Sequence, residues 1–273
     1  MKTTLSILQY RDIIDAINVT YGINLKQHAM SSLRQHLLMV MDKSKYSNPT
    51  LVVKGIKEDK KFFDQIVSCL YCEHISLFRD PAMWRILKSQ VLDMLPRNAQ
   101  LKIWIPEVSQ ASDYYSLIIM LKKFGILTKS KVAISDESNI NLEKCRHGEL
   151  DSNIINTSES NIKRLDASED LYNYVSQSGR KFYLDKSLLK TTYIQKGGVL
   201  DISLPFKPNL VIFRNKMIYF NPVKEQKVIN KLHKEMVGGG FLITGVKEDI
   251  SAFEIKGKFR VHNKDEQIYK RSF

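Results

Sequence analysis

Long apolar runs are absent from this 273-residue sequence, and that absence excludes the simplest membrane architecture. No apolar stretch reaches the roughly 18 residues that a transmembrane helix needs, so no membrane span is expected. The first residues, MKTTLSILQYRDIIDAI, contain no small-residue cleavage site, and Arg11 and Asp12 interrupt their apolar pattern. We therefore interpret them as a helix of the mature protein and not as a signal peptide.

Cysteine is scarce, with only Cys69, Cys72 and Cys145 in the chain. An odd, low count argues against a disulfide scaffold and fits a reducing cytoplasm, which is the expected location. Cys69 and Cys72 form a CxxC pair that, together with Cys145 and His147, has the ligand types of a Cys₃His zinc site. The apolar residues around the pair instead favour cysteines buried on a helical core face, so plain thiols and no metal are predicted.

Acidic residues are outnumbered, with 29 Asp and Glu against 42 Lys and Arg, giving a formal net charge of +13. Such a charge attracts acidic partners: nucleic acid, anionic lipid or an acidic protein surface. The basic residues are spread along the chain without a long run, and no pattern of aromatic and basic residues suggests base stacking. Nucleic-acid binding is therefore not expected, and a solvated basic surface is the simpler interpretation.

Glycine is missing where α/β proteins most often use it. Residues 101–105, LKIWI, have the composition of a buried strand, and residues 114–125, YYSLIIMLKKFG, that of a helix. A turn between such elements commonly holds a nucleotide, because glycine lets backbone N–H groups come close to the ligand. This turn carries Pro106, Glu107 and Gln110 instead.

The pattern of the chain changes near residue 100. Residues 1–75 are expected to form a helical domain, in which Asn48-Pro49 is expected to break the helical pattern before a helix at about 58–71. Residues 76–100 are expected to form a linking helix that opens at Asp80-Pro81. Residues 101–273 alternate between strand and helix patterns.

The second part of the chain is predicted to form a doubly wound, mostly parallel sheet. Its strands are expected in LKIWI, KVAIS, NLVIF and FLITG, and the tail FEIKGKFRVHNKDEQIYKR alternates like an antiparallel hairpin at the sheet edge. Residues 149–192 are polar and irregular, with short aromatic pieces, and suggest a small inserted subdomain. Ligands of such sheets bind at the carboxyl ends of the strands.

Three segments resemble the CheR family of chemotaxis receptor methyltransferases. They are HISLFRDPAMWRILKSQVL, the loop from Trp104 to Leu117, and PNLVIFRNKMIYFNPVKEQKVINKLHKEMVGGGFLITG, in which FRD and RNxMIYF form a specific pairing. The resemblance extends over nearly the whole chain. It implies a helical N-terminal domain and a Rossmann-like domain that binds S-adenosylmethionine, with a small β-subdomain inserted in the second domain.

The reaction that the resemblance implies is transfer of a methyl group to glutamate carboxylates of receptor signalling domains. It needs little acid–base chemistry, because an activated sulfonium must mainly be held in line with a carboxylate. By resemblance, the catalytic positions are Arg79, which could hold a carboxylate bidentately, and Tyr219. The cofactor-binding positions are Asp136, Asn215, Asp113 and Ser112. A cap on the following helix is an equally open role for Asp136.

Several positions depart from the family pattern at places that would touch the cofactor. Residues of other types replace the family's asparagines, threonine, glycines and acids at Glu73, Ile75, Glu107, Ala111, Ser112, Ser138 and Gly198. We therefore expect a signalling or binding homologue with an eroded S-adenosylmethionine site and weak or absent methyl transfer. The alternative is an active S-adenosylmethionine-dependent protein-glutamate O-methyltransferase with an atypical cofactor loop. The expected partner is an acidic helical receptor domain that docks on the basic N-terminal helices.

Overall fold

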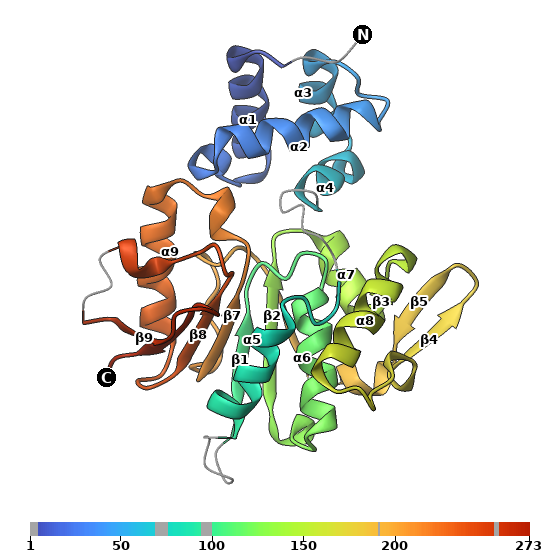
Figure 1. The fold of residues 1–273 in the computed structure, drawn as a ribbon. Coiled ribbons are helices and arrows are strands. Elements are labelled where there is room, and N and C mark those ends of the chain that lie inside the picture. The colour runs from blue at the N-terminus through green and yellow to red at the C-terminus, as the bar shows by residue number, and fades with distance from the viewer. Residues whose placement is uncertain (1–4, 69–75, 94–99, 191, 254–256) are drawn as a thin grey trace.

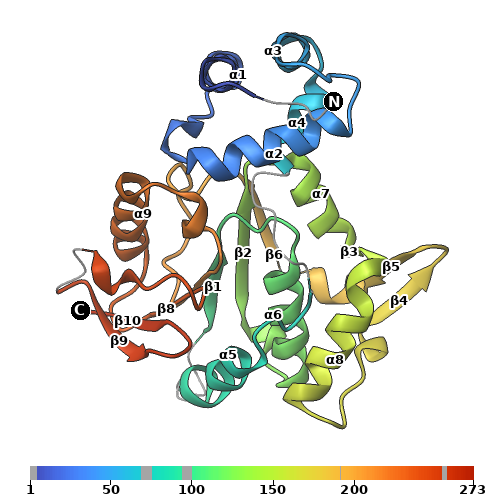
Figure 2. The ribbon, with the colours of Figure 1, turned by 45° about the horizontal axis from the view of Figure 1, so that its top comes forward.

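The computed structural model describes residues 5–68, 76–93, 100–190, 192–253 and 257–273 (Figure 1). In these segments a helical domain lies beyond one end of a seven-stranded sheet that has helices on both faces (Figures 1 and 2). Within them, no helix is both long and apolar enough to cross a membrane. The expected mixed α/β fold is confirmed.

The helical domain consists of α1 (Ile7–Tyr21), α2 (Met30–Asp42), α3 (Pro49–Glu58) and α4 (Lys60–Ser68). Helix α1 begins with a capping box, in which Ser6 and Gln9 each accept a backbone N–H of the other, and it ends at Gly22 in the left-handed conformation. Its apolar stripe packs into a core shared with the other helices of the domain.

Helix α3 corrects the sequence analysis, which expected no helix between the break at Asn48-Pro49 and residue 58. The Asn48 side chain accepts a hydrogen bond from the Leu51 backbone N–H at 2.9 Å, and Pro49 occupies the first helical turn. This pair therefore starts a helix, because a proline at that position loses no helical hydrogen bond and an asparagine before it caps the free N–H groups.

The main sheet has the strand order β6-β2-β1-β7-β8-β10-β9. The first five strands are parallel, and the tail hairpin adds β10 and β9 in antiparallel pairing. The strand bounds are β1 Lys102–Ile105, β2 Lys131–Asp136, β6 Thr192–Lys196, β7 Leu210–Phe213, β8 Phe241–Thr244, β9 Phe259–Asn263 and β10 Ile268–Arg271. The predicted parallel sheet with an antiparallel hairpin at its edge is confirmed.

Alternating side chains of each central strand enter two different cores. Ile103 and Ile105 of β1 join a core that includes α5 (Pro81–Ile86), α6 (Ser112–Lys123), α7 (Asn139–His147) and α8 (Ile155–Leu165). Trp104 faces the opposite core, which includes α9 (Pro222–Glu235) and the helical domain. This two-sided burial explains why the strands are nearly continuous apolar runs.

Two smaller features complete the fold. The segment between α7 and β6 contains α8 and a three-stranded antiparallel sheet of β3 (Glu149–Leu150), β5 (Lys181–Leu184) and β4 (Val175–Ser178). A π-helix, Leu87–Leu92, continues α5.

The helical domain is attached to the turn after β7 by backbone contacts. The Ala29 N–H donates to the Tyr219 carbonyl oxygen at 2.7 Å, and the Asn221 N–H donates to the Gln27 carbonyl oxygen at 2.9 Å. His28 and Phe220 form an antiparallel bridge between these two bonds. The domain therefore covers the carboxyl ends of the parallel strands, where ligands of such sheets bind (Figures 1 and 2).

Candidate cofactor site

The loop after β1 keeps a glycine-like backbone without glycine. Glu107, Ser109 and Ala111 have φ angles of 51°, 53° and 65°, in the left-handed region that side chains disfavour. The loop is attached to β2, because the Val108 N–H donates to the Ser135 carbonyl oxygen at 2.9 Å. Tertiary contacts therefore impose the backbone conformation that local sequence disfavours.

Asp136, at the end of β2, serves as the internal anchor of this loop. Its buried carboxylate accepts the Ser109 N–H at 2.7 Å, the Ser138 N–H at 2.7 Å and the Asn141 side-chain amide at 3.2 Å. Burial raises its pKa, while these hydrogen bonds lower it. The cap of α7 is Ser138, not Asp136, which corrects the second role considered for Asp136. Binding of ribose by Asp136 stays a prediction.

Glu107 extends from the loop to the segment after β6. Its side chain is 1% exposed, and its Oε1 accepts the Val199 N–H at 2.8 Å. Its Oε2 is buried without a hydrogen-bond partner. Burial, and then the nearby carboxylates of Glu137 and Asp136, raise the pKa of Glu107 to about 8.

Three carboxylates converge on Gly198. A Cβ at that position would lie 2.6 Å from Glu137 Oε1 and 3.3 Å from both Asp201 Oδ2 and Glu107 Oε1. Burial raises the pKa of Glu137 to about 7. A larger side chain at position 198 would displace this group, so the glycine and the carboxylates fit each other.

Lys224, at the start of α9, faces the same group from the other side. Its amine lies 3.3 Å from His28 Nε2 and 4.0 Å from the centre of the Phe220 ring. Burial lowers the pKa of Lys224, and burial with the neighbouring lysine charge lowers that of His28 to about 3. A cavity of about 480 Å³ lies between Lys224, the carboxylates and the Tyr21–Asn24 segment of the helical domain.

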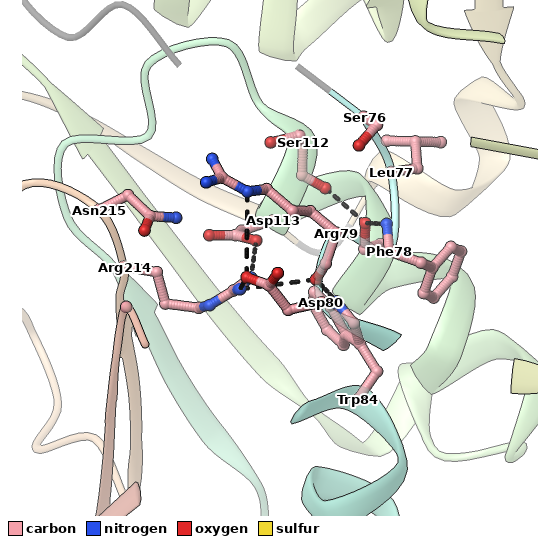
Figure 3. Close-up of polar contacts among 12 residues, drawn as sticks. Ser76, Leu77, Phe78, Arg79, Asp80, Trp84, Ser112, Asp113, Arg214 and Asn215 are labelled. Atoms are coloured by element: carbon pink, nitrogen blue, oxygen red, sulfur yellow. Dashed lines mark hydrogen bonds and ion pairs between the residues drawn. The ribbon is translucent and has the colours of Figure 1, made fainter. Parts of the chain in front are cut away.

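A second cluster links three segments of the second domain. The Arg214 guanidinium is fully buried and pairs with Asp80 at 2.5 Å and with Asp113 at 2.7 Å (Figure 3). The predicted site residue Asp113 thus holds Arg214 in this structure. Arg79 makes a longer ion pair with Asp80, at 3.9 Å, and its side chain is 36% exposed (Figure 3).

Asn215 follows Arg214 and adopts φ 57°. Its backbone N–H donates to Glu248 Oε2 at 2.7 Å, and Glu248 also accepts the N–H groups of Gly245 at 2.6 Å and Ile218 at 3.3 Å. The sequence analysis missed Glu248. The one signal in the sequence was an acid four residues past a buried strand, in a segment that begins with Gly245.

Ser112 and Tyr219 differ in their surroundings. Ser112 is the buried first residue of α6, and its carbonyl oxygen accepts the Ser116 hydroxyl at 2.6 Å. The Tyr219 ring lies 5.8 Å from the His36 ring of α2, at the contact between the domains. The structure therefore brings Arg79, Asp113, Arg214 and Asn215 close to one another (Figure 3), and places Tyr219 at the helical domain.

Comparison with protein families identifies the fold. Residues 73–268 match the model of the CheR methyltransferase, SAM binding domain. The chain belongs to the CheR methyltransferase family. The CheR-family relatives include the putative methyltransferase Cher3 of Pseudomonas putida, 22% identical over 265 residues that make up 97% of each chain. A chemotaxis protein methyltransferase of Vibrio parahaemolyticus is 23% identical over 261 residues, 93% of each chain.

Among solved structures, the N-methyltransferase NodS from Bradyrhizobium japonicum, in complex with S-adenosyl-L-homocysteine, matches this CheR-family chain with a TM-score of 0.39. It is 9% identical, and the match covers 72% of this chain and 88% of NodS.

The departures from the CheR pattern gather at the loop after β1 and across the cavity. By the resemblance, Glu107 and Ala111 stand at family glycine positions, and both have positive φ angles. Glu73 and Ile75 lie outside the described residues, as do Cys69 and Cys72. Cys145 is buried with a raised pKa, and no cluster of metal-ligand residues occurs among the described residues. The expectation of plain thiols stays a prediction.

Proposed function

We propose that this CheR-family protein has kept the methyltransferase fold as a signalling or binding module, and that it does not bind S-adenosylmethionine. The observation that carries the proposal is the bridge from Glu107 Oε1 to the Val199 N–H, 2.8 Å long. It crosses the carboxyl end of β2, between the loop after β1 and the segment after β6. A nucleoside bound at this edge of the sheet would need the space that this hydrogen bond occupies.

The residues present do not fit the cofactor. Binding would require Glu107 to leave its buried position, which would deprive the Val199 N–H of its acceptor and place a carboxylate against the ligand. Each such loss costs about 1 to 3 kcal/mol, and a micromolar dissociation constant corresponds to only about 8 kcal/mol in total. The Asp136 carboxylate, already holding three N–H donors, has little capacity left for ribose hydroxyls.

The alternative is an active protein-glutamate O-methyltransferase with an atypical cofactor loop. The cluster of Arg79, Asp113, Arg214 and Asn215 favours it, because the resemblance assigns these residues to family motifs and the fold holds them in one place (Figure 3). In that case Arg79, with a side chain 36% exposed, would orient the substrate carboxylate.

Isothermal titration calorimetry of the full chain distinguishes the proposed binding module from the alternative, an active methyltransferase. We expect no heat with S-adenosylmethionine or S-adenosylhomocysteine at micromolar concentrations, while the Vibrio parahaemolyticus relative serves as a positive control for the assay. A double variant, Glu107→Gly with Ala111→Gly, removes the bridge and is expected to gain affinity for S-adenosylhomocysteine. A clear micromolar isotherm with the unaltered protein would overturn the proposal and restore the enzyme.

We further propose an acidic, helical receptor segment as the partner, docking on the helical domain in the cytoplasm. The segment of residues 30–61 carries seven basic and three acidic residues. Six of its basic side chains are exposed lysines: Lys43, Lys45, Lys54, Lys57, Lys60 and Lys61. Ion pairs within the domain involve Lys45 with Asp59, at 3.4 Å, and Lys54 with Glu58, at 3.9 Å. The surface left over is positive and would attract a glutamate-rich helix.

A further inference from the structure

The cavity beside Glu107 has the features of a ligand site in its own right. It measures about 480 Å³ and lies between the helical domain and the carboxyl edge of the sheet. This volume falls in the range of about 300 to 1,000 Å³ that is usual for small-molecule sites. We call it the edge cavity, and its polar lining consists mainly of Glu107, Glu137, Lys196, Asp201, Lys224 and Lys227.

Two carboxylate oxygens in the edge cavity are buried without a hydrogen-bond donor. They are Glu107 Oε2 and Glu137 Oε2. A buried acceptor without a partner costs free energy, and it is satisfied when a ligand brings N–H donors. Because Glu107 and Glu137 both approach Gly198, one donor group could contact both carboxylates.

The lysine nearest to these carboxylates does not satisfy them. Among the described residues, Lys224 makes no ion pair within 4.0 Å, and its amine contacts His28 Nε2 and the Phe220 ring instead. Its charge nevertheless acts on both Glu107 and Glu137. The space between the amine and the carboxylates belongs to the edge cavity.

Charge is distributed unevenly along the edge cavity. The inner end holds two carboxyl groups, Glu107 and Glu137, against one buried lysine, Lys224. The mouth holds two exposed lysines, Lys196 and Lys227, against the exposed Asp201. A ligand that complements this arrangement is positive at its inner end and negative at its outer end.

The positive end is not a metal ion. No group of three or more metal-ligand residues in the described part of the chain has a geometry that could hold one. Adjacent carboxylates with free oxygens instead match the paired N–H donors of a guanidinium, or the three donors of an ammonium group.

We infer that the edge cavity binds a small zwitterionic amino compound, with its guanidinium or ammonium group on Glu107 and Glu137 and its carboxylate at Lys196 and Lys227. The inference rests on the proposed function, because it assigns to another ligand the space that S-adenosylmethionine would occupy in an active methyltransferase. The site would make the protein a sensor of such a compound, with the ligand joining the helical domain to the sheet.

The test uses L-arginine as the probe, with two analogues as matched controls, in calorimetry and thermal shift on the full chain. L-citrulline keeps the shape of arginine but has no charge at the inner end, and agmatine keeps the guanidinium but has no carboxylate. We expect L-arginine to bind. Each analogue should bind more weakly by a factor of about ten or more, since one charge-assisted contact contributes about 1.5 to 3 kcal/mol.

Variants locate the binding. Glu107→Gln keeps an acceptor for the Val199 N–H but removes the charge, and it should weaken L-arginine binding about tenfold or more. Lys227→Gln, at the exposed mouth, should weaken L-arginine but leave agmatine unchanged, and it tests the site even if the buried variant fails to fold. Glu58→Gln, on the exposed face of α3, is the control and should bind like the unaltered protein.

The pH dependence gives a second readout. Burial and the carboxylates of Glu137 and Asp136 favour the neutral form of Glu107, while the Lys224 charge and the Val199 N–H oppose it, and the pKa of Glu107 is about 8 without ligand. Asp201 likewise favours the neutral form of Glu137, and Lys196 opposes it. A bound cation favours the ionised form, so binding releases protons and tightens as the pH rises from 6 towards about 9.

The outcomes separate this inference from the proposed function. L-arginine binding that Glu107→Gln and Lys227→Gln weaken supports the inference. The absence of L-arginine binding at millimolar concentrations, or binding that both variants leave unchanged, overturns it while leaving the proposed function standing. Binding of S-adenosylmethionine in the same assay overturns the proposed function, whatever L-arginine does.

Discussion

Glu107 is an unusual residue because its carboxyl group is buried and only partly hydrogen-bonded. By the resemblance it stands at a family glycine position. It is 1% exposed, and only one of its two carboxylate oxygens has a hydrogen-bond donor. Removal from water, in the company of Glu137, raises its pKa from 4.5 to about 8. The protein therefore carries a carboxyl group that holds its proton in the folded state at neutral pH and loses it on unfolding.

This difference predicts a pH-dependent stability that Glu107→Gln removes. Between about pH 5.5 and 7.5 the unfolded chain has ionised Glu107 and the folded chain has not, so raising the pH favours unfolding. Against the unaltered protein, Glu107→Gln should gain free energy of unfolding over this window, by about 1 kcal/mol per pH unit. Urea denaturation at several pH values measures it. If the free energy of unfolding changes with pH in the same way for the variant and the unaltered protein, Glu107 ionises normally.

The loop between β1 and α6 shows how an element can keep a backbone that its residues disfavour. Ala111 adopts φ 65° directly before the first residue of α6, with 1% of its surface exposed. A left-handed conformation costs a residue with a Cβ roughly 1 to 2 kcal/mol relative to glycine. The neighbouring strands and Asp136 hold the loop in place, so the strain persists in the folded protein.

Ala111→Gly is accordingly expected to stabilise the protein by about 0.5 to 1 kcal/mol, after allowance for the greater entropy of glycine in the unfolded chain. The matched control is Ala16→Gly in the middle of α1, which should destabilise the protein by about 1 kcal/mol or more, because the φ angle there suits alanine and a buried methyl group is lost. Chemical denaturation measures both. A destabilising effect at Ala111 would mean that its methyl contacts outweigh the backbone strain.

Arg214 joins the element ends around the site. Its guanidinium contacts Asp80 at the start of α5 and Asp113 in the first turn of α6, while its own backbone follows β7 (Figure 3). The side chain is 1% exposed, so its charge depends on these two partners. Removing it would take from Asp113 its paired guanidinium and leave Asp80 with only the longer, partly exposed pair to Arg79.

Arg214→Met should destabilise the protein by about 3 kcal/mol, because a partner of a buried ion pair is removed. Arg79→Met is a matched control in the same cluster: Arg79 lies 3.9 Å from Asp80 with a side chain 36% exposed, and its loss should change stability by less than about 1 kcal/mol. Thermal and urea unfolding of both variants provide the comparison. Equal effects at the two positions would contradict the structural role assigned to Arg214.

At the scale of the whole molecule, the net charge of +13 and the arrangement of two domains matter most. The exposed lysines of the helical domain do not belong to the loop after β1, so the loss of cofactor binding that we propose would leave that surface unchanged. The proposed partner binding through charge would therefore not depend on methyl transfer.

The proposed docking is expected to weaken steeply with salt, because exposed charges are screened over about 8 Å at physiological ionic strength. Titration of the protein against an acidic helical receptor fragment, at low and high salt, measures this. Reversing the charge of Lys43, Lys57 and Lys61 should abolish binding at low salt, whereas reversing three lysines of the second domain, Lys122, Lys181 and Lys186, should not. If the fragment fails to bind at low salt, the docking proposal is wrong.

The sequence alone determined the order of elements and the family. Apolar runs such as NLVIF and FLITG predict buried parallel strands because both of their faces must be covered, and the FRD and RNxMIYF motifs fix the resemblance. Helix α3 was missed because Asn48-Pro49 has the composition of both a break and a helix start. Only the position of the following apolar residues in the core decides between them.

Tertiary structure alone decided what the site residues contact. Asp113, Arg214 and Asp80 are far apart in sequence, and only the fold makes them one ion-pair cluster. The sequence indicated that Glu107 replaces a glycine, but not that its carboxylate reaches the Val199 N–H and shares the space around Gly198 with Glu137. Local patterns determine strands and helices because those depend on neighbours in the chain. The charge state and contacts of a buried carboxyl group depend on residues that the fold brings from other elements, and those are set only when the chain is packed.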